Sequence, residues 1–154
     1  MEIKNFNRRY KRIVSSINDL ITREKKALDE YFSEFTDERL VEFSESSDED
    51  KAAFVESYYS CAEQITECFN EISSMSARIY KLTNDAHAIE SEEAKKKSLR
   101  VFEAVTNLSR ATQHFLSHSD TIISDDRTFS YSKLHMLTIS FHTTLNEIAS
   151  SLTD

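Results

Sequence analysis

The sequence contains neither glycine nor proline in 154 residues, although average usage supplies roughly 7% and 5% of these residues. Glycine is the usual residue where the backbone needs a positive φ, and proline presets many turns. A fold built from β-hairpins would lack its normal turn residues, whereas helices need neither residue. The same absence excludes glycine-rich phosphate loops and nucleophile elbows. The sequence therefore predicts an all-α protein.

Apolar residues recur in alternating steps of three and four, which is the spacing of helices that pack lengthwise in a bundle. The pattern is strongest in the second of four such segments, where it continues without a miss. Its members are Phe54, Tyr58, Cys61, Ile65, Cys68, Ile72, Met75, Ile79, Leu82, Ala86 and Ile89. This seam is expected to be buried.

The other three segments carry the same spacing. The first segment of the chain has a gap at Glu24. The third of the four is widened by Leu99, Phe102, Leu116 and Ile123. We expect helices at 3–35, 48–86, 92–123 and 130–152, with a short helix at 37–43. They are expected to form one domain, 1–154, which folds as an elongated antiparallel bundle of four helices.

Where the second helix ends is left open by the sequence, because no glycine closes it. Asn84 and Asp85 are one candidate end, and Ser91 is a candidate start for the next helix. Alternatively, the second and third helices run on as one, which would give an extended dimeric coiled coil.

Composition favours a soluble, folded chain. Charged residues make up 30% of the sequence and apolar residues 39%, with ten Phe and six Tyr. No apolar run approaches the ~18 residues of a membrane span, and the N-terminal residues have no uninterrupted apolar stretch. We expect a cytoplasmic protein. Cys61 and Cys68, about 10 Å apart on one helix face, are expected to be free core residues.

The net charge of −8 is unevenly distributed. Residues 1–26 hold eight basic and three acidic side chains, and residues 27–50 hold ten acidic and one basic. An antiparallel bundle brings the starts of the first and third helices together, which predicts a basic end. Its possible anion-contacting residues are Arg8, Arg9, Arg12, Lys95, Lys96 and Lys97.

The opposite end is predicted to be acidic and to dock a protein partner with a basic surface. The candidate docking residues are Asp37, Glu38, Glu42, Glu45, Asp48, Glu49, Asp50, Asp125 and Asp126. The negative net charge argues against binding of nucleic acid, except for weak binding at the basic end.

Two histidines, His114 and His118, stand four residues apart and share a helix face, so they are weak candidates for metal ligands. A zinc site needs three or four ligands. None of the five histidines has a Glu three residues before it, which excludes the ferritin-like di-iron pattern. We expect no metal and no cofactor.

Arg110 and His114 lie on one helix and are the weak candidates for catalysis. They resemble the Arg–His pair of compact all-α ribonucleases of the HEPN type, which implies RNA cleavage. The resemblance covers five residues, and three residues separate the pair where the family has four to six. An enzyme is therefore the less favoured class.

The sequence favours a non-catalytic protein–protein interaction module. Size and acidity suggest a small inhibitor, an immunity protein or a phage-encoded antagonist. A homo-oligomeric helical scaffold, including a homodimer, is the first alternative, and an HEPN-like ribonuclease is the second.

Overall fold

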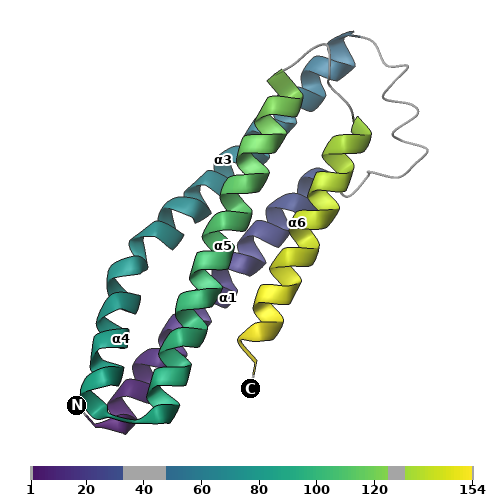
Figure 1. Ribbon diagram of the computed structural model, residues 1–154. Helices are drawn as coiled ribbons and strands as arrows, with labels where there is room; N and C mark the ends of the chain where they lie inside the picture. The colour runs from purple at the N-terminus through teal and green to yellow at the C-terminus, as the bar shows by residue number, and fades with distance from the viewer. Residues whose placement is uncertain (1, 33–47, 125–130, 154) are drawn as a thin grey trace.

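A computed structural model describes residues 2–32, 48–124 and 131–153 of the chain. The described residues form α1 (Ile3–Phe32), α3 (Asp48–Ser74), α4 (Ser76–Ile89), α5 (Glu92–Ser124) and α6 (Tyr131–Ser151), with no strand among them. The helices lie lengthwise in an elongated bundle (Figure 1). The predicted all-α bundle is confirmed.

The bundle has four rods, because α3 and α4 follow one another along the same side (Figure 1). The predicted helices at 92–123 and 130–152 differ from α5 and α6 by a few residues at their ends, whereas the single helix predicted at 48–86 is two helices, α3 and α4, that together reach Ile89. The predicted helix at 3–35 is described as far as Phe32, and the predicted short helix at 37–43 lies outside the described residues.

Two helices organise the packing. Both α1 and α5 pack against every other described helix, and they also pack against each other. They form a diagonal of the bundle, with α3 and α4 on one side of it and α6 on the other (Figure 1). The α1 helix is therefore in contact with neighbouring helices on several of its sides.

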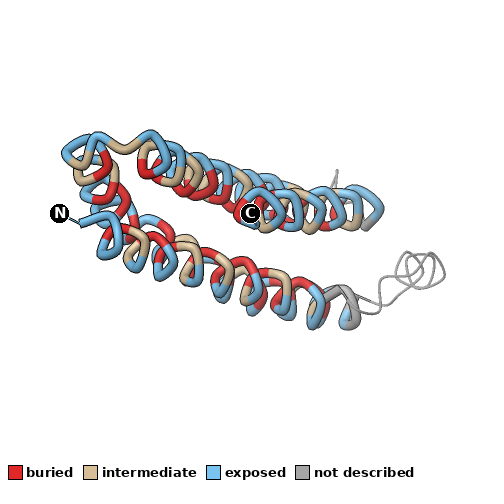
Figure 2. The backbone as a smooth tube through the Cα atoms, turned by 90° about the horizontal axis from the view of Figure 1, so that it is seen from below, coloured by how far each residue is buried: buried red, intermediate tan, exposed pale blue. Residues whose placement is uncertain are grey.

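The predicted seam of the second rod is the core. Every seam residue from Phe54 to Ala86 is buried, and Ile89 is half-buried against the core. Buried positions of each helix face inward between the rods (Figure 2). Cys61 and Cys68 are free and buried, and burial raises the pKa of their thiols to about 12 and about 11. Both thiols are therefore protonated at neutral pH.

The second rod bends at Met75. The Met75 N–H donates to the carbonyl oxygen of Ile72 at 3.1 Å, which is the tighter spacing of a 3₁₀ turn. The hydroxyls of Ser73 and Ser74 also donate to carbonyls of the preceding turn. Such side-chain bonds compete with the helical ladder and bend helices. The bend changes the direction of α4 relative to α3.

The chain reverses at Glu90, which has φ 60° and ψ 29° in the left-handed region. Its N–H donates to the carbonyl oxygen of His87, and the Ser91 hydroxyl then accepts from the Ala94 N–H at 3.3 Å. Ser91 caps α5 as the sequence suggested. The proposed end at Asn84 and Asp85 is wrong, since α4 continues to Ile89, and a continuous second and third helix is excluded.

Replacing Glu90 by glycine should stabilise the protein. A left-handed residue with a Cβ costs roughly 1–2 kcal/mol, and the greater freedom of glycine in the unfolded chain offsets part of that cost. We expect Glu90→Gly to raise the unfolding free energy by about 0.5–1 kcal/mol in urea titrations. Glu92→Gly, two residues later and inside α5, is the matched control and should destabilise. A loss of stability in Glu90→Gly would contradict the turn geometry.

Candidate docking groove between α4 and α5

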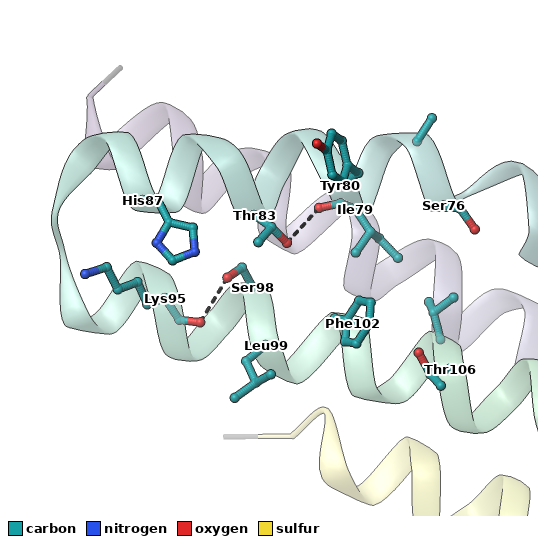
Figure 3. A pocket seen from close by; sticks show the side chains of 12 residues that line it. Ser76, Ile79, Tyr80, Thr83, His87, Lys95, Ser98, Leu99, Phe102 and Thr106 are labelled. Carbon is teal, nitrogen blue, oxygen red and sulfur yellow. Dashed lines mark hydrogen bonds between the residues drawn. The ribbon is translucent and has the colours of Figure 1, made fainter.

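A groove of about 840 Å³ runs along the outer side of the α4–α5 pair. Its floor includes the buried side chains of Ile79, Ser98 and Val105. The groove extends from Ser76 to His87 on α4, a length of about 16 Å at the helical rise. It therefore follows the helix axes over about three turns (Figure 3).

The walls are large apolar side chains that remain in contact with solvent. Tyr80 is 71% exposed, Leu99 is 54% exposed and Phe102 is 53% exposed. Tyr80 comes from α4 and Phe102 from α5, and they lie on opposite sides of the groove (Figure 3). The sequence places Leu99 and Phe102 on the widened apolar stripe of their helix, and no described helix covers them on this side.

Two hydroxyl groups of the groove are hydrogen-bonded within their own helices. Thr83 Oγ1 donates to the Ile79 carbonyl oxygen at 3.0 Å, and Ser98 Oγ donates to the Lys95 carbonyl oxygen at 2.9 Å (Figure 3). These donors need no bond from a ligand. The groove therefore presents mainly apolar surface to an occupant.

One end of the groove carries basic character. His87 and Lys95 lie together at this end (Figure 3), and no carboxylate is among the residues that line the groove. The end also coincides with the first turn of α5, where the helix dipole is positive. Lys95 Nζ lies 3.5 Å from Glu92 Oε1, but Glu92 is largely exposed, so this pair is weak.

The predicted basic end is assembled, and three of its six basic residues, Arg9, Lys95 and Lys97, are in ion pairs. Arg9 forms an ion pair with Asp85 on α4. Lys97 Nζ lies 2.8 Å from Glu93 Oε1 and 3.0 Å from Asn7 Oδ1, and it stands over the Tyr10 ring. Arg8, Arg12 and Lys96 are exposed. These contacts show that the starts of α1 and α5 lie side by side, as the charge pattern predicted.

The predicted acidic docking residues fall mainly outside the described part of the chain. Asp37, Glu38, Glu42, Glu45, Asp125 and Asp126 lie there. The remaining three, Asp48, Glu49 and Asp50, are in the first turn of α3, and Glu49 is exposed. The acidic docking surface stays a prediction.

Arg110 and His114 are both exposed on α5. The ring centroids of His114 and His118 lie 3.9 Å apart, and His118 Nδ1 donates to the His114 carbonyl oxygen at 2.9 Å. Within the described ranges, no group of three or more His, Cys, Asp or Glu side chains is placed to hold a metal ion. In the same ranges, no helix is long and apolar enough to cross a membrane.

A buried carboxyl group was missed by the sequence analysis, which treated Glu24 as a gap in the seam. Glu24 is fully buried in α1, and its Oε1 accepts a hydrogen bond from Thr112 Oγ1 of α5 at 2.9 Å. Its Oε2 is buried with no hydrogen-bond partner. Burial raises the pKa of this carboxyl from 4.5 to about 8, although the Thr112 hydrogen bond and the Arg23 charge lower it. Glu24 is therefore mostly protonated at neutral pH.

The raised pKa makes the stability of the fold depend on pH. Well below pH 4.5 the carboxyl is protonated in both the folded and unfolded states, so it makes no contribution to the pH dependence of stability. Between 4.5 and about 8 only the unfolded state ionises, so stability falls as pH rises. The total loss above that window is roughly 5 kcal/mol at most.

Glu24→Gln should remove this loss, because the amide stays neutral and its oxygen still accepts from Thr112. In urea unfolding at pH 9, the variant should be more stable than the wild type by several kcal/mol, and the two should be nearly equal at pH 4. Glu67→Gln, at an exposed position of α3, is the matched control and should follow the wild type. Parallel pH profiles for Glu24→Gln and the wild type would contradict the burial of a neutral carboxyl.

Models of known protein families, curated proteins and solved structures were compared with this chain, and none of them matches.

Proposed function

We propose that the chain is a non-catalytic protein–protein interaction module, and that the groove between α4 and α5 receives an amphipathic helix of a protein partner. The observation that carries the proposal is the exposure of Tyr80, Leu99 and Phe102 around one elongated groove. Exposed apolar surface of this kind marks interaction sites on folded proteins. Burying these side chains on docking would supply the affinity.

The shape of the groove favours a helix as the occupant. The groove lies between two antiparallel helices and follows their axes, so a third helix can pack along it. A length of about 16 Å accommodates about 11 residues of partner helix. Such a helix presents apolar side chains at positions i, i+3 or i+4, and i+7 to one face.

The charges favour an acidic residue at one end of that helix. Lys95 and His87 mark the end of the groove next to the first turn of α5, and the groove lining contains no carboxylate to repel the occupant. A carboxylate of the partner, placed beyond its last apolar anchor, would pair with Lys95 in place of the exposed Glu92. The partner segment is thus an amphipathic helix of about three turns with an acidic end.

An inhibitor or antagonist can act in this way, because occupying a partner helix blocks the contacts that this helix otherwise makes. That role fits the sequence-based expectation, and it requires no reaction at the groove. The titratable side chains that line the groove are Tyr80, His87 and Lys95.

The test is site-specific photocrosslinking in cells of the native host, with p-benzoylphenylalanine in place of Phe102. We expect a crosslink to one protein, and mass spectrometry should place it in an amphipathic helix with an acidic end. The matched control carries the crosslinker at Tyr59, which is 47% exposed on α3, and should give little of this product. Leu99→Asp should prevent the crosslink from Phe102 while leaving the melting temperature nearly unchanged, since Leu99 is half-exposed.

Three results would contradict the proposal. A crosslink from Phe102 to a second copy of this chain would identify a homo-oligomeric scaffold instead. Equal yields from Phe102 and Tyr59 would show that the groove is not selective. Loss of function in Arg110→Ala or His114→Ala, with folding intact, would favour the ribonuclease alternative.

A further inference from the structure

Glu24 occupies the one place in the described structure where a buried carboxyl joins the two organising helices. It lies on α1, and its hydrogen-bond partner Thr112 lies on α5. Because α1 and α5 pack against each other and against all other described helices, a change at this contact reaches the whole interior. The proposed docking of a partner helix does not involve the Glu24 carboxyl.

The surroundings of Glu24 leave one of its oxygens unsatisfied. Oε2 is buried and has no hydrogen-bond partner among the described residues, so only one of the two oxygens of an ionised carboxylate would be hydrogen-bonded. On α3, Cys68 is buried near enough for the Glu24 charge to raise the pKa of its thiol. The neutral site is therefore tolerable, whereas a negative charge there would have a cysteine and a hydroxyl as its immediate neighbours.

Nearby charges offset the charge of an ionised Glu24 only in part. Arg23, the adjacent residue on α1, is directed to Glu71 of α3, with which it forms an ion pair. From α6, His142 Nε2 lies 3.4 Å from Asp29 Oδ1, more than one helical turn further along α1. From α5, Thr112 contributes a neutral hydroxyl. An ionised Glu24 would thus be stabilised mainly by water.

We propose that Glu24 is a pH-sensitive latch between α1 and α5. Protonated, it lies in the core and holds the two helices closed. Ionised, it draws water into the interior, and the middle of the bundle opens locally while the rest of the chain remains folded. Local opening of this kind takes less free energy than complete unfolding, because most of the seam stays packed.

The two free cysteines report on this opening. The Glu24 charge acts on the Cys68 thiol, whereas Cys61 lies one heptad away on the same seam, with its Sγ 3.6 Å from the Ala27 carbonyl oxygen. Both thiols are buried, so alkylation of either one requires the structure to open. Their comparison within one chain separates a local opening near Glu24 from global unfolding.

The experiment is a brief reaction of the intact protein with iodoacetamide at pH 6 to 9.5, with the labelled cysteine identified by peptide mass spectrometry. We expect the ratio of Cys68 to Cys61 labelling to rise about tenfold or more as Glu24 ionises. In Glu24→Gln the ratio should stay flat over the same range, and in the exposed-site control Glu63→Gln, also on α3, it should rise as in the wild type.

Other results would overturn the latch. A ratio that is flat in the wild type would show that Glu24 ionises without local opening or only on global unfolding. An equal rise in the wild type and in Glu24→Gln would assign the opening to another group. If Glu24→Gln does not fold, the wild-type ratio alone decides, because Cys61 serves as the internal reference for the effect of pH on the thiols.

Discussion

The direct packing of α1 against α5 is the constraint on which the rest of this structure depends. Each of these helices contacts every other described helix, so the remaining rods are placed by how closely the two approach. Their interior faces are largely apolar, and a buried hydrogen bond between Glu24 and Thr112 joins the two helices. A buried polar contact of this kind adds little net stability, but it favours one alignment of the two helices over others. We infer that it fixes their register.

The groove follows from the same arrangement. Since α1 and α5 fill the diagonal, α4 packs against both, and one face of the α4–α5 pair turns away from α1. The bend at Met75 sets the direction in which α4 runs along α5. On the other side of the diagonal, α6 packs on α5 and α1 and leaves this face open (Figure 1). Tyr80, Leu99 and Phe102 are exposed because the bundle contains no further rod there within the described residues.

Much of the fold could be predicted from the sequence, because regular spacing reports which face of a helix is buried. The seam from Phe54 to Ala86 is an example, since each predicted residue is in the core. The spacing does not report how wide the covered face is, so it left open whether Leu99 and Phe102, on the widened stripe, are covered or exposed. Their exposure depends on which neighbouring helix covers them, and this is a property of the tertiary packing.

Glu24 illustrates a second limit. A charged residue in an apolar seam indicates either a break in the pattern or a buried polar contact, and spacing alone favours the break. The signal that distinguishes the two is a polar residue on a facing helix at the same level, here Thr112. The pairing of α1 with α5 is needed to find it. The left-handed turn at Glu90 was likewise hidden, because glycine usually marks that conformation.

The packing of α1 against α5 requires a closed interior around a neutral Glu24. The carboxyl carbon of this residue reports directly on its protonation. In a ¹³C NMR titration of the intact protein, compared with Glu24→Gln to assign the signal, we expect the Glu24 carboxyl to titrate with a pKa of about 8. The ordinary pKa of a solvated glutamate is about 4.3. A Glu24 signal that titrates at that value would show a hydrated side chain, and the closed α1–α5 interior would then be wrong.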